Sequence, residues 1–161
     1  MHSQPLLASI GVLLVDDSYS ERLLTRCQLE QIGYRVIEVD GGHEAIRLLD
    51  ERHDEIDLIL LDVEMPDLDG YEVASRIRQR EQQGYGCWRP ILFLSSLCSP
   101  EQMLIGVNSG GDDFLCKPVD VRVLAARLKA MARIAQRYHS VRCRKSALDR
   151  ANSIEARCRR S

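Results

Sequence analysis

Residues 58–70 read LILLDVEMPDLDG, an apolar run that ends at Asp62 and gives way to a polar segment. The run that begins this stretch has the length of a strand, and its lack of alternating polar residues predicts that both faces are buried. Four other runs of similar length are bounded by turn-forming residues. The strands that we expect from these runs are at 11–15, 34–39, 57–61, 91–95 and 113–116.

Segments with helical spacing of apolar residues lie between the expected strands. The expected helices are at 18–32, 42–52, 70–81, 100–109 and from about 119 onward. In the first of them, Ser18 followed by Glu21 predicts a capping box, and Gly33 predicts the end of the helix. The inward residues that we expect in this helix are Leu23, Leu24, Cys27 and Ile32. For the next two helices they are Ala45, Ile46, Leu48 and Leu49, followed by Val73, Ala74 and Ile77.

The alternation of five strands with five helices predicts an α/β fold with a parallel sheet, because parallel neighbours require long crossover connections. Right-handed crossovers place helices on both faces of the sheet. The expected architecture is therefore an open, doubly wound sheet of five strands. In such a sheet, functional groups gather beyond the carboxyl ends of the strands.

The composition limits the class of protein. The chain has 161 residues, of which 45% are hydrophobic and 29% are charged, as is usual for one globular domain. No apolar run approaches the roughly 18–20 residues that span a bilayer, and the N-terminus lacks the basic start of a signal peptide. The six cysteines include no CxxC pair, which predicts reduced thiols in a cytoplasmic protein rather than a zinc site or a disulfide framework. Cys98 and Cys116 are expected to be small buried hydrophobic side chains.

Polar side chains follow four of the expected strands, at the point where each strand ends. These side chains are Asp16, Asp17, Asp62, Ser95 and Lys117. Three carboxylates at one edge raise one another's pKa and require a compensating cation, for which Mg²⁺ is suited because it prefers oxygen ligands. A hydroxyl donor and an ammonium group beside them complete the chemistry of a phosphoryl-handling site.

Each of these residues also has an ordinary structural explanation when it is considered alone. Asp17 could cap a helix, Asp62 could begin a turn, and Lys117 could be a solvated surface residue. Asp67 and Asp69 fit loop and N-cap positions better than ligand positions. The occurrence of the required residue type at four strand ends favours a joint site over coincidence.

Four stretches of the chain carry a resemblance to a known family. They are VLLVDDS at 12–18, LILLDVEMPDLDG at 58–70, PILFLSS at 90–96 and GGDDFLCKP at 110–118. Through these motifs, residues 11–135 resemble the receiver domain of two-component response regulators, which is a CheY-like domain. The resemblance implies a flavodoxin-like fold with the strand order 2-1-3-4-5. It also implies a signalling module rather than an enzyme, which takes a phosphoryl group from a sensor histidine kinase, a phosphotransfer protein or a small phosphodonor.

The resemblance also implies roles for individual residues. Asp62 would be the phosphoacceptor, and Ser95 and Lys117 would contact the phosphoryl oxygens. The implied ligands of Mg²⁺ are Asp17, Asp62, the backbone carbonyl of Glu64 and, through water, Asp16. Ser95 and Phe114 would form a switch that changes the face made by the fourth helix, the fifth strand and the fifth helix, although Phe114 also suits a strand core. The peptide bond between Lys117 and Pro118 would be cis.

The C-terminal segment differs from the rest of the chain. Residues 138–161 carry seven Lys or Arg and two acidic residues, whereas the part before them is acidic. A heptad pattern predicts that residues 136–161 form a helical extension, a short coiled coil that makes a homodimer together with the fifth helix. The heptad positions are Met131, Tyr138, Lys145 and Asn152, with Ile134, Val141, Leu148 and Glu155. Solvated coiled-coil flanks explain the basic residues better than nucleic-acid binding does, because aromatic residues are not interleaved with them.

The ends of the chain suggest a larger protein. We expect residues 1–10 to be an N-terminal extension and the C-terminal helix to lead to an output domain outside this sequence. By analogy, that domain could be a diguanylate cyclase, a phosphodiesterase or a phosphatase.

Two other classes of protein remain open on the sequence alone. A phosphatase of the haloacid dehalogenase type also uses an Asp nucleophile, Mg²⁺ and a lysine, but its first strand should end in Asp-x-Asp, whereas Asp16 and Asp17 are adjacent. A pseudo-receiver that serves only as a dimerisation scaffold would not need clustered carboxylates, which are costly without a cation. Binding of Mg²⁺ and acceptance of phosphate would separate this last class from a working receiver.

Overall fold

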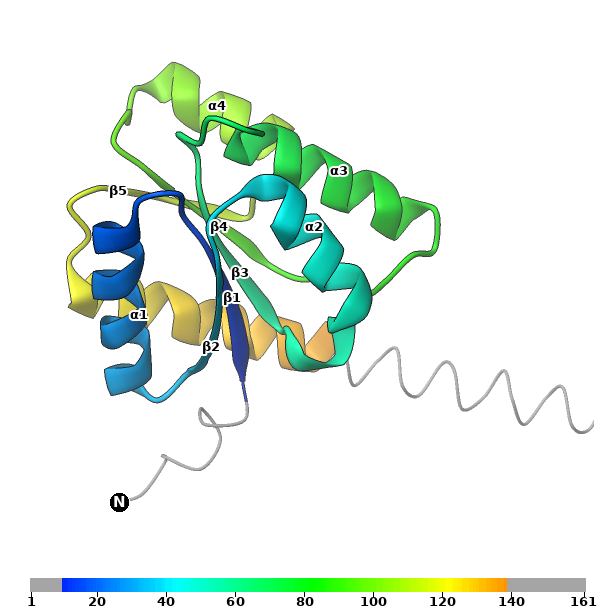
Figure 1. Ribbon diagram of the computed structural model, residues 1–161, viewed down its shortest axis with the longest axis horizontal. Helices are drawn as coiled ribbons and strands as arrows, with labels where there is room; N and C mark the ends of the chain where they lie inside the picture. The colour runs from blue at the N-terminus through cyan, green and yellow to red at the C-terminus, as the bar shows by residue number, and fades with distance from the viewer. Residues whose placement is uncertain (1–9, 139–161) are drawn as a thin grey trace, which may run out of the picture.

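The computed structural model describes residues 10–138, and these form a five-stranded parallel sheet with helices on both faces (Figure 1). The strands are β1 (Gly11–Val15), β2 (Arg35–Val39), β3 (Leu58–Asp62), β4 (Ile91–Ser95) and β5 (Asp113–Cys116). They lie in the order β2-β1-β3-β4-β5, and every neighbouring pair is parallel. The predicted α/β, flavodoxin-like architecture is therefore confirmed.

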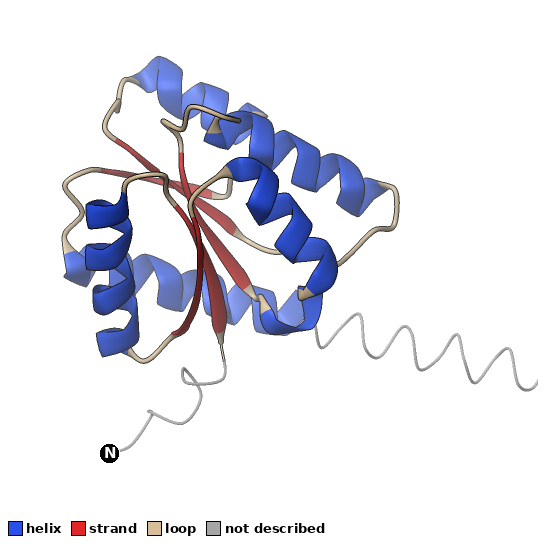
Figure 2. Ribbon diagram, in the orientation of Figure 1, coloured by secondary structure: helices blue, strands red, loops and turns tan. Residues whose placement is uncertain are grey.

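The helices cover the sheet in two layers. Their bounds are α1 (Tyr19–Ile32), α2 (Gly42–Glu51), α3 (Gly70–Gln82), α4 (Pro100–Asn108) and a C-terminal helix described over 121–138, with a short 3₁₀ turn at His53–Glu55. Figure 2 shows α2, α3 and α4 on one face of the sheet and α1 with the C-terminal helix on the other. In the described residues, no helix is both long and apolar enough to cross a membrane.

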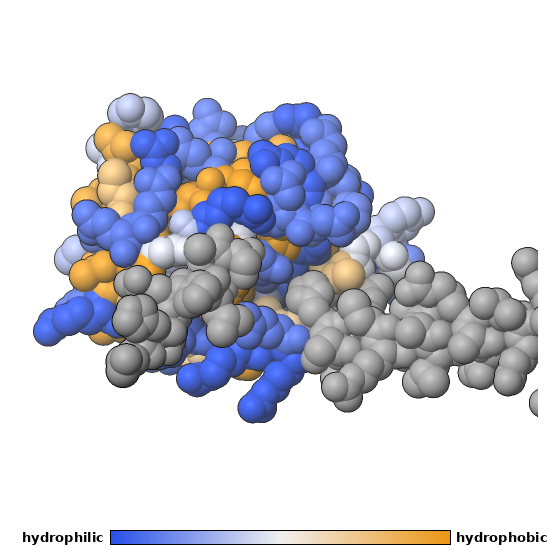
Figure 3. All heavy atoms as spheres, turned by 90° about the horizontal axis from the view of Figure 1, so that it is seen from below, coloured by the Kyte–Doolittle hydropathy of each residue, from blue (hydrophilic) through white to orange (hydrophobic). Residues whose placement is uncertain are grey.

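Side chains that alternate along each strand divide the interior into two apolar cores. From β1, Leu13 and Val15 pack with α2 and α3, while Val12 and Leu14 pack with α1 and the C-terminal helix. All four are fully buried, which explains why the strands show no alternation of polar residues. On the face drawn in Figure 3, hydrophobic residues show only in patches between hydrophilic ones, as expected where helices cover the apolar strands.

The inward faces of α2 and α3 follow the prediction. Val73, Ala74 and Ile77 of α3 are buried, and so is Ala45 of α2. The other predicted α2 residues are partly buried and pack against the same core: Ile46, Leu48 and Leu49. The high amphipathicity of these two segments made their buried side easy to identify.

The predicted inward face of α1 is confirmed at Ile32, which packs against the core, but it is wrong for the other three residues. Leu29 is its one fully buried residue, whereas Leu24 is 61% exposed and Leu23 and Cys27 also face solvent. Leu residues occur on more than one side of this helix, so the spacing of apolar residues alone does not identify the face that is buried. Leu24 lines an open pocket together with Leu94 and Val119 instead of packing into the core.

The predicted capping box of α1 is also wrong, although its predicted end is correct. The Ser18 side chain accepts no bond from a backbone N–H of the first turn of the helix, and its hydroxyl instead shares a hydrogen bond with that of Ser20. Glu21 instead forms an ion pair with Lys117, far away in the sequence. Gly33 does end the helix, with a φ of 110° that a residue with a side chain rarely adopts.

The described part of the C-terminal helix tests two of the heptad positions. Met131 is buried in the core of the domain itself, so it is not available to a coiled-coil seam, which corrects that position. Ile134 and Tyr138 are exposed, and no described residue after Ala135 is buried. The remaining heptad positions, residues 1–9 of the expected N-terminal extension at 1–10 and the basic residues after 138 lie outside the described residues. The dimer therefore stays a prediction.

Candidate functional site

Three carboxylates meet at the carboxyl end of the sheet. Asp16 and Asp17 directly follow β1, and Asp62 is the last residue of the neighbouring strand β3. One ligand oxygen from each of them lies within 4.8 Å of the others. Asp16 and Asp62 are buried, whereas Asp17 is exposed, so the cluster opens to solvent on one side.

Lys117 supplies the nearest positive charge. It follows β5, and its Nζ atom lies 3.0 Å from Oδ1 of Asp62 and 3.3 Å from Oδ2 of Asp16. The same ammonium group also pairs with Glu21 of α1. The peptide bond between Lys117 and Pro118 is cis, as the resemblance implied.

Burial and charge crowding change the acidity of these groups. Burial, against the opposing effect of Lys117 and with a smaller contribution from the carboxylates of Asp16 and Glu64, raises the pKa of Asp62 to about 7. Burial also raises the pKa of Asp16. For Lys117, burial alone would lower the pKa, but the bonds to Glu21 and Asp62 outweigh it and raise the pKa. The site therefore holds a fixed cation and more negative charge than that cation neutralises.

The arrangement fits a hard divalent cation. Oδ1 of Asp62 is buried, and within the described residues it receives no hydrogen bond of good geometry, although Nζ of Lys117 is near. A buried carboxylate oxygen in this state is costly unless a cation or a donor reaches it. Carboxylate oxygens in a partly open cluster are the ligands that Mg²⁺ usually takes.

Ser95 and Glu64 form a contact that the sequence did not predict. Ser95 ends β4 and is fully buried, and its hydroxyl donates to Oε1 of Glu64 at 2.5 Å. The backbone N–H groups of Ser96 and Leu97 donate to the same carboxylate at 3.4 Å and 3.2 Å. Burial opposes ionisation of Glu64, but these bonds outweigh it and lower its pKa. The ionised Glu64 side chain thus holds Ser95 and the loop after β4 in place.

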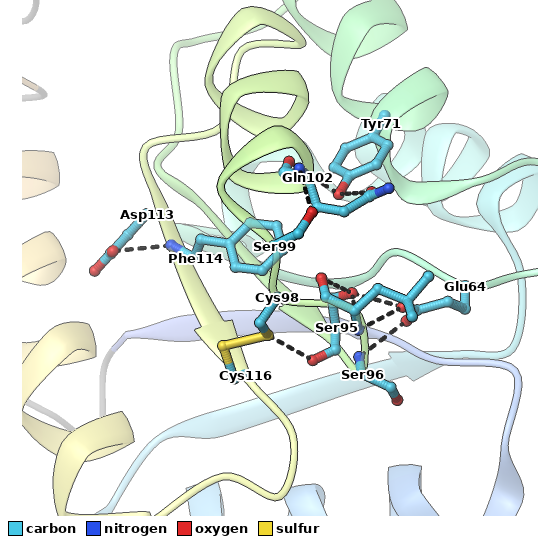
Figure 4. Close-up of a disulfide and its surroundings, with 11 residues drawn as sticks. Glu64, Tyr71, Ser95, Ser96, Cys98, Ser99, Gln102, Asp113, Phe114 and Cys116 are labelled. Carbon is cyan, nitrogen blue, oxygen red and sulfur yellow. Dashed lines mark hydrogen bonds between the residues drawn. A yellow bond between two sulfur atoms is a disulfide. The ribbon is translucent and has the colours of Figure 1, made fainter.

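Phe114 lies on β5 with its side chain toward α4 (Figure 4). The residue is half-buried, and its ring centroid is 6.1 Å from that of Phe93. A Cβ atom at Gly106 of α4 would stand 3.2 Å from the Phe114 ring, so this glycine lets the helix approach the aromatic ring closely. Phe114 is therefore packed inward in this conformation, at the edge of the core.

The cysteine prediction is wrong for one pair. Cys98 and Cys116 form a disulfide, with Cα atoms 5.9 Å apart (Figure 4). Neither is a buried hydrophobic residue, since Cys116 is exposed and Cys98 is half-buried. The parallel register places Cys116 opposite Ser95, three residues before Cys98, and this proximity cannot be read from a spacing of 18 residues. The other described cysteines, Cys27 and Cys87, are free thiols.

The loop after β3 has the structural role that was predicted for it. Asp69 caps α3 by accepting a hydrogen bond from the Glu72 N–H at 2.8 Å. Asp67 faces His43 and the start of α2 instead of the carboxylate cluster. Both residues are therefore local stabilisers of the loop.

Comparison with known proteins agrees with this geometry. Residues 12–129 match the family described as the response regulator receiver domain. The chain belongs to this family. The transcriptional regulatory protein AfsQ1 of Streptomyces coelicolor is 36% identical over 127 residues, which are 79% of this chain and 53% of that protein. The chain spans about half the length of the curated relatives it matches first.

Solved structures show the same receiver fold. The chemotaxis protein CheY4 of Vibrio cholerae superimposes with a TM-score of 0.67 at 32% identity, covering 76% of this chain and 98% of that one. A probable two-component system response regulator/GGDEF domain protein gives a TM-score of 0.72 at 30% identity, covering 81% of this chain and 52% of that one. This receiver domain is thus a signalling module of a two-component system, a class that works with a histidine kinase or a phosphotransfer partner and generally depends on Mg²⁺.

Proposed function

We propose that this receiver domain accepts a phosphoryl group on a carboxylate oxygen of Asp62. The observation that carries the proposal is a buried carboxylate whose Oδ1 lacks a well-formed hydrogen bond, 3.0 Å from a lysine ammonium group and beside two further carboxylates. The P–O bond to Asp62 forms as the P–N bond of a phosphohistidine on a kinase or phosphotransfer protein breaks, and the imidazole keeps the bonding electrons. With a small phosphodonor such as acetyl phosphate, acetate leaves instead.

The residues around Asp62 have different roles in this phosphoryl transfer. The Lys117 ammonium group moves from the carboxylates to an oxygen of the incoming phosphoryl group and neutralises part of its charge. Asp17, Asp62, the backbone carbonyl of Glu64 and, through water, Asp16 would hold Mg²⁺, which when bound supplies further positive charge at the phosphoryl oxygens. Because a protonated acid is a poor nucleophile, the pKa of about 7 leaves Asp62 only partly active near neutral pH until a cation stabilises its ionised form.

The Ser95–Glu64 contact supports a mechanism for the switch. In the present conformation the Ser95 hydroxyl is engaged by Glu64. When the phosphoryl group arrives, the hydroxyl turns to one of its oxygens, and Glu64 loses its strongest partner. The loop that carries Ser96 and Leu97 is then free to rearrange, and Phe114 and α4 adjust to it.

The surface that this rearrangement would change is apolar and exposed. Leu104 and Val107 of α4 are 64% and 67% exposed, and Leu97 of the preceding loop is 56% exposed. Exposed apolar side chains that are grouped in this way are typical of protein contact surfaces. The face formed by α4, β5 and the C-terminal helix is therefore the route to a homodimer and to an output domain. That domain could be a diguanylate cyclase, and one structural neighbour is itself a response regulator with a GGDEF domain. We place the domain in the cytoplasm, where histidine kinases present their phosphoryl groups.

Intact-mass measurement with acetyl phosphate and Mg²⁺ tests the acceptor. The wild-type chain should gain the mass of one phosphoryl group, and Asp62→Asn should gain none. Asp69→Asn is the matched control, because it lies in the same loop and Asn caps a helix as well as Asp does. A gain that survives Asp62→Asn would place the acceptor elsewhere, and a wild-type chain that gains nothing would favour a pseudo-receiver.

A further inference from the structure

The Cys98–Cys116 disulfide encloses the whole of α4 in a covalent loop. Cys98 lies in the segment between β4 and α4, and Cys116 is the last residue of β5. The cysteines are 18 positions apart in the sequence, and the segment between them includes every residue of the helix. The bond therefore ties the segment that enters α4 to the strand that follows it.

This bond also lies directly on the proposed switch. Cys116 pairs with Ser95 in the register of β4 and β5, and it is bonded covalently to Lys117. The Ser95 carbonyl oxygen accepts a hydrogen bond from the Lys117 N–H at 2.8 Å and lies 3.4 Å from Sγ of Cys98 (Figure 4). The Ser95 carbonyl is thus held by the backbone of Lys117, the residue next to Cys116, and it lies against the sulfur of Cys98.

The disulfide can be reached by solution oxidants and reductants. Cys116 is exposed and Cys98 is half-buried, so the bond lies at the surface. The fold does not depend on it, because apolar side chains fill a core on each face of the sheet. In a reducing compartment, a surface disulfide of this kind forms and breaks in response to the redox state.

We propose that Cys98 and Cys116 are an oxidation site that locks the loop between β4 and α4, so that phosphorylation of Asp62 changes α4 only in the reduced protein. This inference rests on the proposed function of Asp62 and Ser95. A disulfide keeps its two Cα atoms within roughly 4.4–6.8 Å of each other. Any rearrangement that separates the loop after Ser95 from the end of β5 is therefore blocked while the bond exists. Asp62 and Lys117 stay in place, so phosphoryl transfer itself continues.

Peroxide supplies the oxidising equivalents. The exposed Cys116 thiolate attacks one oxygen of H₂O₂ and forms a sulfenic acid. The hydroxide that leaves takes up a proton and becomes water. The Cys98 sulfur then attacks the Cys116 sulfur, and a second water leaves. In total, two thiols and one H₂O₂ give one disulfide and two waters. A cellular dithiol reverses the reaction by thiol–disulfide exchange and is itself oxidised.

Hydrogen exchange over residues 97–112 tests the lock in the full chain. The oxidised and reduced proteins are compared with and without beryllium trifluoride and Mg²⁺, a stable mimic of the acyl phosphate. Peptide mapping after H₂O₂ should find Cys98 linked to Cys116. We expect the mimic to change exchange in this segment of the reduced protein and the change to fall by about fivefold or more in the oxidised protein.

Two variants and one further measurement decide the outcome. The double variant Cys98→Ser, Cys116→Ser should respond like the reduced wild type under both conditions, whereas Cys27→Ser, which removes an exposed free thiol on α1, should keep the redox dependence. Equal responses in the two redox states, or no Cys98–Cys116 link after peroxide, would overturn the lock. Intact mass with acetyl phosphate separates this from the proposed function: phosphoryl uptake in both redox states supports the lock as stated, whereas no uptake by the reduced protein overturns both.

Discussion

The two ends of the parallel sheet both bury charged side chains, but they pair them differently. At the carboxyl end, Asp16 and Asp62 share Lys117 with an exposed glutamate, and one oxygen of Asp62 has no well-formed hydrogen bond. At the opposite end, the buried guanidinium of Arg89 donates to the backbone carbonyls of Ile56, Cys87 and His53. At the carboxyl end, negative charge remains for a ligand to neutralise. At the opposite end, the protein's own carbonyl groups accept the hydrogen bonds of the buried guanidinium.

A second arginine completes the pairing at the opposite end. Arg78 of α3 pairs with Glu81 at 2.8 Å and with Asp112 at 2.7 Å, and it also donates to the Gly110 carbonyl at 2.9 Å. Burial raises the pKa of both carboxylates, as it does for Asp62, but here a guanidinium faces each of them. Burial of charge is thus common to both ends, and incomplete pairing distinguishes the functional one.

The largest effect on stability should come from the fully paired end. Arg89→Met removes a buried guanidinium that donates to three backbone carbonyls, and we expect a loss of about 3 kcal/mol in the free energy of unfolding, measured with urea. Phosphoryl uptake per folded molecule should not change. Arg47→Met, which removes an exposed arginine of α2, should leave unfolding almost unchanged. If Arg89→Met changed the free energy of unfolding as little as Arg47→Met, the pairing of Arg89 would not stabilise the protein, and the two ends of the sheet would not differ in the way we describe.

At the carboxyl end of the sheet, where the charges are incompletely paired, a substitution should lower the rate of phosphorylation. Lys117→Met removes the fixed cation beside Asp62, so the rate of phosphorylation by acetyl phosphate should fall about 100-fold. The rate is followed by intact mass at saturating Mg²⁺. Lys129→Met, on the C-terminal helix, is the control and should retain the wild-type rate. A loss of less than about threefold would mean that Lys117 is a structural ion pair like those at the other end.

Removal of the acceptor charge should stabilise the protein. The folded pKa of Asp62 is about 7 against an ordinary 3.8, so the folded state binds more protons than the unfolded state between these values. The unfolding free energy of the wild type, measured with a chelator present, should therefore fall as the pH rises from about 4 to about 7.

Asp62→Asn should lack most of this slope. At pH 8 it should be more stable than wild type by about 2 kcal/mol, less than the full pKa shift would give because solvent screens the site and Lys117 loses a partner. Asp69→Asn should keep the wild-type slope. If the variant and the wild type had the same free energy of unfolding at pH 8, the ionised Asp62 carboxylate would not destabilise the folded protein.

The smallest effect should come from the contact between Glu64 and Ser95. Glu64→Ala frees the Ser95 hydroxyl to bond the phosphoryl group, so the lifetime of the acyl phosphate should lengthen by about threefold. The decay is followed by intact mass after removal of acetyl phosphate. Glu44→Ala on α2 is the matched control. An unchanged or shorter lifetime would show that Glu64 does not compete for this hydroxyl.

Prediction from sequence was best where the signal was local and strong. The apolar runs placed β1, β4 and β5 with the observed bounds, and the strand ends identified the side chains that meet at the carboxylate cluster. The prediction of the buried face failed for most of α1, because leucines lie on several sides of this helix. Ser18 and Glu21 also showed a capping pattern, but Glu21 pairs with Lys117, which is distant in the sequence.

The order of residues along the chain was enough to predict the parallel α/β fold, the family and the five polar residues at the strand ends, because burial and turn formation act on neighbouring residues. Three contacts became visible only in the folded chain: the Glu64 carboxylate holds Ser95, Cys98 meets Cys116, and Arg89 is buried among carbonyls. Each of these contacts joins different strands, helices or loops. Their existence depends on the register of parallel strands and on the paths of the loops, which no spacing along the chain encodes.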